Sequence, residues 1–408
     1  MTIRAMTLED EYQYKLLSRV CFMFAADEDY QEKLKKSEKE QKKQEEQTDH
    51  IKLGAFDDSG KLIAGLYVVP FMMYFDGNPQ KMAGIQGVIT APEARNGGVM
   101  GKVMQECLTK IKQDGYIFSA LYPFSYAYYR KFGYDVAHKT TNATIQMQDM
   151  EFYEFPTGEV RFWRKGDDLA DIKAIYGKFA QKRNYAIVRT DKDWAKIMEE
   201  DPYIARKYTY VHYDTQNTPD AYIKFGVNDD DPNEDKKIVV DEMAWINPAA
   251  LHSMFGFIAK LRPQFGEFTW NVPNELDLYL LFPEAWNLQI SSESSMMFRI
   301  VDILPAIHAM QAPLGSGNVT IAVTDKNFPE NTGTYSIAWQ NGKIAAKKES
   351  PKPAAADMST TIEALSQMLI GYSTPSMSNN RKDTTINNNL QALNALFPPK
   401  ARYIWERF

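Results

Sequence analysis

Residues 85–104 read IQGVITAPEARNGGVMGKVM, an apolar run that meets a glycine-rich turn and then an amphipathic segment. After the turn, apolar side chains recur every four residues, which is the spacing of one helix face: Val99, Val103, Cys107 and Ile111. The pattern predicts a strand, a tight turn and a helix that ends near Gly115. Cys107 lies on the apolar face of this helix, which favours a core residue over a nucleophile.

The flanking segments complete a βαβ unit. Residues 62–75, LIAGLYVVPFMMYF, run into Asp76 and Gly77, and a second apolar run follows, so we expect a hairpin with its turn at this pair. Residues 116–122, YIFSALY, form a short continuous apolar run. Such a run is typical of a buried strand, here parallel to the strand before the helix.

The same order of strand, proline, helix and strand returns later in the chain. Residues 238–246, IVVDEMAWI, predict a strand, residues 248–261 a helix and residues 267–272, EFTWNV, a further strand. Where the first unit has ARNGG, the second has NPAAL, with no glycine to admit a phosphate. We therefore expect a second domain of similar fold without the glycine-rich site.

From about residue 300 the pattern changes again. Two apolar strands are expected around residues 319–325 and 333–339, with a tight hairpin turn at NGK, residues 341–343. A helix follows, for which Thr360 and Glu363 predict a capping box and Gly371 a stop. The predicted fold class is α/β (α+β) with mixed central sheets, and the predicted domains span residues 1–150, 151–298 and 299–408.

The composition of the 408 residues, with 44% hydrophobic residues and a formal net charge of -6, is that of a soluble globular protein. The mild acidity gives no general reason to bind nucleic acid or anionic lipid and favours a cationic small molecule. The N-terminus has neither a signal core nor a membrane-length apolar run, so we expect a cytoplasmic protein.

Metal and disulfide chemistry are not expected. The two cysteines cannot form a disulfide framework, and the five histidines have no ligand spacing. Residues 31–50 alternate in charge and predict an exposed helix or loop. The acidic run Asp27, Glu28 and Asp29 is either an exposed loop or the anionic mouth of a site for a polycation.

The glycine-rich turn is suited to an anion. Backbone amides at a helix start are unpaired and point outward, and glycine allows a ligand to approach them closely. The turn is not a nucleotide-triphosphate loop, because too few residues separate its glycines and Val103 stands where Ser or Thr would meet magnesium. It also lacks the first glycine of a dinucleotide fingerprint. By itself, the stretch fits a strand-to-helix turn without any ligand equally well.

A second segment, YYRKFGY at residues 128–134, carries a resemblance. Residues 95–100, RNGGVM, resemble the R-x-x-G-x-G/A signature of the GNAT acetyltransferases, and YYRKFGY resembles their Tyr-x-x-x-Gly-aromatic segment. The whole chain resembles the Eis-type acetyltransferases, which combine a GNAT domain, a GNAT-like domain without a cofactor site and a domain similar to sterol carrier proteins. Met100 departs from the Gly or Ala of the signature, although Eis-like sequences tolerate a larger apolar residue there.

The resemblance implies acetyl-coenzyme A as the co-substrate. Its pantetheine arm would lie along Val88, Ile89 and Thr90, and the amide of Val88 or Ile89 would polarise the thioester carbonyl. The pyrophosphate would lie on the turn and the first helical amides, after Arg95. The residues implied in this contact are Asn96, Gly97, Gly98, Val99, Met100 and Gly101.

Two further residues take catalytic roles by resemblance. Tyr129 matches the family's proton donor to the leaving thiolate, among the many tyrosines that surround it. The terminal carboxylate of Phe408 would accept a proton from the amine substrate or bind its ammonium group. The family acetylates aminoglycosides and forms hexamers. The main alternative is a non-catalytic sensor that binds acetyl-coenzyme A or, in its C-terminal domain, an apolar ligand.

Overall fold

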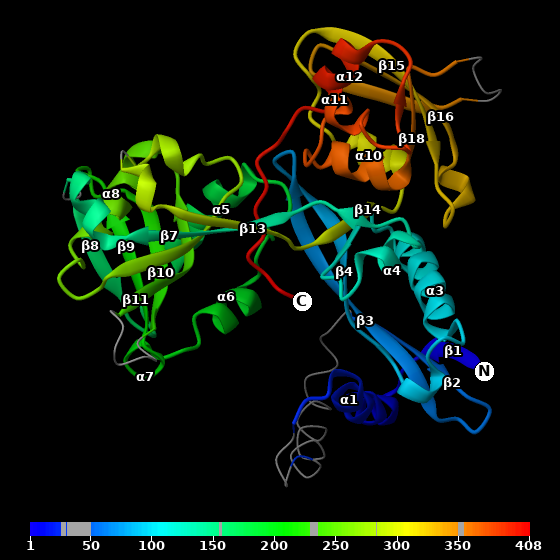
Figure 1. The fold of residues 1–408 in the computed structure, drawn as a ribbon, viewed down its shortest axis with the longest axis horizontal. Coiled ribbons are helices and arrows are strands. Elements are labelled where there is room, and N and C mark those ends of the chain that lie inside the picture. Colours follow the sequence, from blue (N-terminus) through cyan, green and yellow to red (C-terminus); the bar gives the residue numbers. More distant parts are fainter. Residues whose placement is uncertain (26–29, 31–49, 155–156, 229–235, 283, 350–354) are drawn as a thin grey trace.

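The computed structural model describes residues 1–25, 30, 50–154, 157–228, 236–282, 284–349 and 355–408. These residues form three sheets with their helices, arranged as three lobes around the path of the C-terminal segment (Figure 1). Each sheet combines antiparallel pairs with one parallel pair, which confirms the predicted α/β (α+β) class. The acidic run at Asp27–Asp29 and residues 31–49 of the predicted charged stretch lie outside the described residues.

The first domain is built on a seven-stranded sheet in the order β1-β2-β3-β4-β5-β14-β6. Asp76 and Gly77 have φ of 48° and 81°, so they form the predicted hairpin turn between the two longest strands of the sheet. Its elements up to residue 136 are β1 (Thr2–Ala5), α1 (Leu8–Phe22), β2 (Ile51–Phe56), β3 (Leu62–Phe75), β4 (Asn78–Thr90), η2 (Pro92–Ala94), α3 (Val99–Gln113), β5 (Phe118–Leu121), α4 (Tyr126–Arg130) and β6 (Asp135–Val136).

The predicted βαβ unit is confirmed in this sheet. Strand β5 pairs in parallel with β4 from Met82↔Phe118 to Ile85↔Leu121. Helix α3 covers one face of the sheet, and its apolar stripe is fully buried there at Val103, Cys107 and Ile111, whereas Val99 is half-buried. Burial raises the pKa of the Cys107 thiol to about 12, so this cysteine is an inert core residue.

The second domain repeats this arrangement in the sheet order β13-β7-β12-β11-β10-β9-β8. Strand β11 pairs in parallel with β12, and α8 connects the two, as predicted from the second sequence unit. The elements are β7 (Lys139–Gln146), η3 (Met147–Phe152), β8 (Glu159–Trp163), α5 (Ala170–Gln181), α6 (Asp191–Ile197), α7 (Pro202–Ala205), β9 (Lys207–Tyr213), β10 (Pro219–Asn228), β11 (Lys237–Trp245), α8 (Pro248–Ala259), β12 (Glu267–Val272), η4 (Leu278–Leu280), η5 (Ala285–Asn287) and β13 (Gln289–Ser294).

The first two domains exchange strands across their boundary. Strand β7 follows β6 along the chain but pairs with β12 and β13 of the second sheet. Strand β14 (Met297–Ile300) follows β13 but pairs with β5 and β6 of the first sheet. The second sheet therefore includes β7 from residue 139 on, and the first sheet takes β14 from residues 297–300.

The third domain has a five-stranded sheet in the order β17-β16-β15-β18-β19, with its hairpin turn at Asn341 and Gly342 as predicted. The predicted capping box is wrong: α10 begins after Thr361 without a side-chain cap, and the Thr360 hydroxyl instead contacts that of Thr384 at 2.9 Å. The elements are α9 (Ile303–His308), β15 (Ser316–Thr324), η6 (Pro329–Asn331), β16 (Gly333–Gln340), β17 (Lys343–Lys348), β18 (Met358–Thr361), α10 (Ile362–Leu369), α11 (Pro375–Ser378), β19 (Thr385–Ile386) and α12 (Leu390–Leu396).

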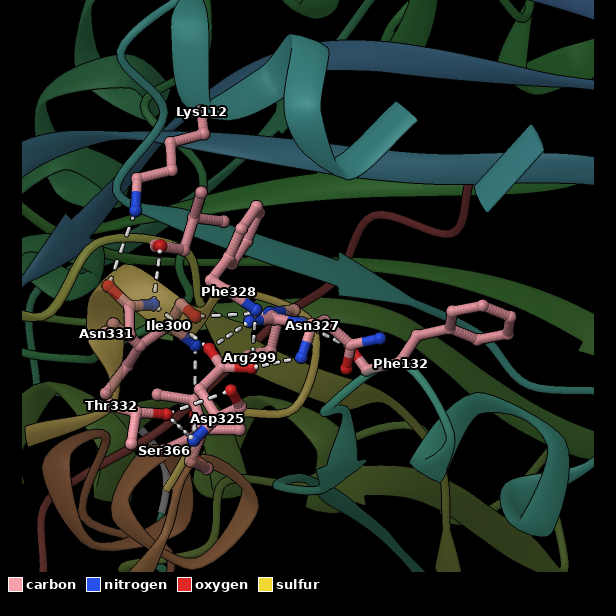
Figure 2. Close-up of polar contacts among 12 residues, drawn as sticks. Lys112, Phe132, Arg299, Ile300, Asp325, Asn327, Phe328, Asn331, Thr332 and Ser366 are labelled. Carbon is pink, nitrogen blue, oxygen red and sulfur yellow. Dashed lines mark hydrogen bonds and ion pairs between the residues drawn. The ribbon is translucent and has the colours of Figure 1, made fainter. Parts of the chain in front are cut away.

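A buried polar cluster joins the first sheet to the third domain (Figure 2). Arg299 of β14 is fully buried and pairs with Asp325 at 2.7 Å, and it also donates to the Phe132 carbonyl. The Ile300 amide donates to the Ser366 hydroxyl of α10 at 2.9 Å. Because an unpaired buried charge costs several kcal/mol, roughly 3–5, the pair holds the two domains in one relative orientation.

Candidate active site

The glycine-rich turn forms an open cradle of amides at the start of α3. Asn96 and Gly98 have φ of 65° and 70°, and residues 95–98 are exposed. Gly98 is the N-cap of α3 and provides no side-chain cap. In the described part of the chain, no hydrogen-bond acceptor is found for the amides of residues 96–101. An added side chain at Gly98 or Gly101 would enter open space, so these amides are accessible to an anionic ligand.

Strand β4 opens away from its neighbour just before this turn. Its parallel pairing with β5 ends at Ile85 and Leu121, so Gln86–Thr90 continue past the end of β5. The pairing of β4 with β3 shifts register between Gly65 and Tyr67, which places a bulge at Gly87 and Val88. Gly87 has φ of 60°, and the Tyr14 hydroxyl donates to its carbonyl. The strand therefore presents a free edge to an extended ligand.

The three predicted residues on this edge have different surroundings. Ile89 is buried against α1, whereas Val88 and Thr90 are half-buried. The Thr90 carbonyl accepts from Arg95 Nε at 3.3 Å and from Cys21 Sγ at 3.2 Å. The Arg95 side chain thus folds back to the end of β4, beside the open amides of α3.

Tyr129 lies in α4, which Ser125 caps and which follows β5. Its ring is buried in the cluster that also holds Leu121 of β5 and Met100 of α3. Burial, and secondarily the neighbouring Tyr128, raise the pKa of Tyr129 well above the usual range of a phenol. The phenol therefore keeps its proton at neutral and mildly alkaline pH, which is the state that a proton donor needs.

The hydroxyl contacts separate the crowded tyrosines into two groups. Tyr122, Tyr126 and Tyr134 each contact another group through their hydroxyls, at 2.9, 2.7 and 2.7 Å. Within the described residues, no hydrogen-bond partner is found for the hydroxyls of Tyr128 and Tyr129. Helix α4 thus carries two phenols without a partner, of which the Tyr128 hydroxyl oxygen is buried, and the sequence singled out only Tyr129.

The chain terminus packs against the first sheet. The Phe408 ring lies 4.9 Å from the ring of Phe71 in β3 and 5.3 Å from the ring of Tyr122, which directly follows β5. An added side chain at Gly84 of β4 would come within 2.9 Å of the Phe408 ring. The last residue of the chain is thus located beside β4, close to where its free edge begins.

The corresponding helix start in the second domain is closed. Asn247 accepts from the Ala250 amide at 2.9 Å, and Pro248 at the first helical position has no amide hydrogen. Among the described residues, no group of three side chains could hold a metal ion. In the same part of the chain, no helix is long and apolar enough to span a membrane.

Comparison with known families assigns these domains. Residues 2–137 and residues 186–300 each match a family model of the acetyltransferase (GNAT) domain, and residues 304–405 match one of the sterol carrier protein domain. A search of curated proteins finds no matching relative. The chain is an acetyltransferase of the GNAT class with two GNAT domains and a sterol-carrier-like domain. Acetyl-coenzyme A is the co-substrate of this class, and the open amides and free β4 edge of the first domain fit it.

Solved structures share the whole three-domain fold. A GCN5-related N-acetyltransferase from Anabaena variabilis superposes with a TM-score of 0.84 at 21% identity, over 100% of both chains. A conserved protein from Enterococcus faecalis V583 gives 0.81 at 20% identity, over 98% of this chain and 97% of that one. Eis1 from Mycobacterium abscessus gives 0.80 at 17% identity, over 100% of both chains. At these identities the likeness defines the fold.

Proposed function

We propose that the chain transfers an acetyl group from acetyl-coenzyme A to a primary amine of a small cationic acceptor, by direct attack in a ternary complex. One observation carries the proposal: the terminal residue Phe408 packs on β4 beside its free edge, on the same sheet whose glycine-rich turn exposes unpaired amides. This placement supports a donor site and a terminal carboxylate that act together in the first domain.

In this proposal, the co-substrate lies along β4 and the start of α3. The pantetheine arm follows the free edge at Val88, Ile89 and Thr90, as an added strand would. The pyrophosphate binds the amides of residues 96–101, with Arg95 at the entrance to the helix. Gly97, Gly98 and Gly101 provide the room, because an added side chain at each would meet nothing closer than 3.5 Å.

Two protons must move in the reaction. The neutral amine attacks the thioester carbonyl, the carbon–sulfur bond breaks, and the amine loses a proton. The carboxylate of Phe408 is the proposed acceptor of this proton or anchor of the ammonium form. Tyr129 is the proposed donor to the leaving thiolate, because its buried phenol is protonated and has no hydrogen-bond partner in the described chain.

The acceptor class follows from charge. The chain carries a formal net charge of -6, and the proposed site adds a carboxylate, so a cationic amine such as an aminoglycoside, a polyamine or lysine is favoured. The three-domain organisation is that of the solved structure of Eis1, which supports an Eis-type enzyme. A cytoplasmic location and a hexameric assembly belong to the same proposal, and the mass of the native particle in solution tests the assembly.

The second candidate is a sensor that binds acetyl-coenzyme A without turnover. Thiol release from acetyl-coenzyme A, measured with a panel of aminoglycosides, polyamines and lysine peptides, separates the two. The enzyme proposal expects release that depends on the amine. Binding of acetyl-coenzyme A without release for any amine would favour the sensor.

The role of the terminus has its own test. One glycine appended after Phe408 moves the carboxylate by roughly 3.3–3.6 Å. We expect this variant to fold normally, to keep its KM for acetyl-coenzyme A and to lose most of its turnover. Full turnover would remove Phe408 from the proposed mechanism.

A further inference from the structure

The C-terminal segment runs between the first two domains. Asn184 donates from its amide to the Ala401 carbonyl at 2.9 Å, and the Tyr403 amide donates to the Asn184 carbonyl at 3.0 Å. The segment that begins at Asn184 is itself bonded to β3, since the Val188 amide donates to the Met72 carbonyl at 2.7 Å. Residues 184–189 therefore lie between β3 of the first domain and the end of the chain, which Figure 1 shows as the red segment passing between the two lobes.

At the end of this segment, Arg189 is held rigidly by the second domain. Its side chain is fully buried and binds both carboxylate oxygens of Glu242 in β11, at 2.9 and 2.5 Å. The guanidinium also stacks on the ring of Tyr176, 3.9 Å from its centroid. The Tyr222 hydroxyl donates to Glu242 from the other side. A guanidinium with a forked ion pair and a stacked ring has little freedom to move.

The remaining nitrogen of this guanidinium reaches the chain terminus. Arg189 Nε donates to Glu406 Oε1 at 2.7 Å, and Glu406 stands two residues before the terminal carboxylate. The backbone carbonyl of Glu406 accepts from the Tyr122 hydroxyl at 2.9 Å. For Phe408 itself, the contacts found among the described residues are those of its ring, against Phe71 and Tyr122. The polar contacts that locate the terminus therefore act at Glu406.

The energetic character of this cluster argues against a role in stability alone. One guanidinium faces two buried carboxylates, and Glu406 Oε2 is buried without a hydrogen-bond partner in the described chain. Burial raises the pKa of Glu406 despite the opposing effect of Arg189. Buried charges of this kind are commonly no more stabilising than apolar residues of similar size. What this cluster provides is therefore a fixed geometry of Arg189 and its two carboxylate partners.

We infer that Arg189 is a positioning residue: the second GNAT domain, whose own helix start is closed, holds Glu406 through Arg189 and thereby sets the terminal carboxylate of Phe408 beside the β4 edge. The inference rests on the proposed function of that carboxylate. It gives the second domain a part in the active site of the first.

The test is a double-mutant cycle on the full-length protein. Glu406→Gln keeps the size of the side chain and removes its charge. We expect a loss of about 10- to 100-fold in kcat/KM for the amine, because small displacements of a catalytic group have effects of that size. The KM for acetyl-coenzyme A should stay within about two-fold, because the α3 amides are untouched. In the chain with a glycine after Phe408, Glu406→Gln should lower kcat/KM almost no further. If Glu406→Gln instead caused a general structural defect, its loss in kcat/KM would add to that of the appended glycine.

A matched control uses a second Arg–Glu pair of the same interdomain region. Arg183 pairs with Glu275 at 2.5 Å and stacks on Phe179, but it does not touch Glu406. Glu275→Gln should leave both KM values and kcat unchanged. If Glu406→Gln does not fold, Tyr122→Phe releases the Glu406 carbonyl without leaving a buried charge unpaired, and it should raise the amine KM or lower kcat in the same pattern.

The outcomes are distinct. Suppose that the appended glycine abolishes turnover. If Glu406→Gln, or in its place Tyr122→Phe, then keeps activity within about two-fold of wild type, the positioning role is overturned. Additive losses in the cycle would also overturn it. Full activity of the chain with the appended glycine would instead refute the proposed role of Phe408.

Discussion

The two GNAT domains place the same elements in the same order, yet among the described residues the helix-start amides lack acceptors in the first domain and are capped in the second. In each domain, two strands connected by a helix pair in parallel: β4 with β5 through α3, and β11 with β12 through α8. Just past this parallel pairing, each first strand carries a bulge: that of β4 lies opposite Leu66 of β3, and that of β11 lies at Asp241. The difference lies in a few side chains: Gly98 leaves the first turn of α3 uncapped, whereas Asn247 and Pro248 close that of α8.

The strand edges differ in the same way. Past its pairing with β5, β4 exposes a free edge beside Gly87. At the corresponding place, β11 carries Glu242, which is buried and bound to Arg189 and Tyr222. The backbone of the fold thus provides the same opening twice. In the second domain Glu242 and its partners Arg189 and Tyr222 lie at this place, whereas in the first we propose that a ligand uses it.

The largest effect is expected for Tyr129→Phe in the first domain. Loss of a general acid lowers turnover by about 10²- to 10⁴-fold. The dissociation constant of acetyl-coenzyme A should change little, because the proposed proton donation to the coenzyme A sulfur develops only as the thiolate leaves. Tyr128→Phe is the matched control, since its hydroxyl also lacks a partner in the described chain. If Tyr128→Phe shows the loss and Tyr129→Phe does not, the acid role passes to Tyr128.

The stability of the fold should depend on pH through the segment that connects the first two domains. His138 is buried where the chain passes from β6 to β7, and burial, with Arg402 as a smaller cause, lowers its pKa from 6.5 to about 4. Because the folded pKa is depressed, the unfolded chain binds this proton first, and stability falls as the pH drops from about 6.5 to about 4, by up to about 3 kcal/mol. Chemical denaturation of His138→Gln should show a smaller loss over this range. The exposed His252→Gln should behave as wild type, and equal slopes for all three would exclude His138 as the cause.

The amide cradle can be closed by one substitution. Gly98→Asp places a carboxylate at the start of α3, where it competes with the pyrophosphate for the amides and repels it. We expect the KM for acetyl-coenzyme A to rise by about 10- to 100-fold, comparable to losing one or two charge-assisted hydrogen bonds. Gly98→Asn has the same size without the charge and should have a smaller effect. An unchanged KM in both variants would show that the donor does not use these amides.

The smallest effect is expected at the matching position of the second domain. Asn247→Ala removes the cap of α8 and should lower the free energy of unfolding by about 1 kcal/mol. The KM for acetyl-coenzyme A should not change, because this helix start is not a donor site. A change in KM with unchanged stability would break the contrast between the two domains.

Local sequence patterns were sufficient for the βαβ unit and the hairpins. The four-residue spacing in α3 and the Asp76–Gly77 pair act within a few residues, so they are visible without a structure. The predicted capping box was wrong because the N-cap position of α10 is Thr361 and not Thr360, and the Thr361 side chain caps no amide. The strand exchange has no local signal, because the partners of β7 and β14 lie far away in the sequence.

The candidate site shows the same limit. The glycine-rich turn could be predicted because a ligand-accessible helix start requires small residues at adjacent positions. Arg189 and Glu406 could not, because each is a single charged residue whose role depends on a partner from another domain. A buried Arg between two Glu side chains has no spacing rule in the sequence.

The central claim is that the first domain alone binds the acetyl donor. Isothermal titration of the full chain with acetyl-coenzyme A tests it most directly. We predict one site per chain, which is weakened by Gly98→Asp and kept in Asn247→Ala. Two sites per chain, or a single site that Gly98→Asp leaves intact, would contradict the account.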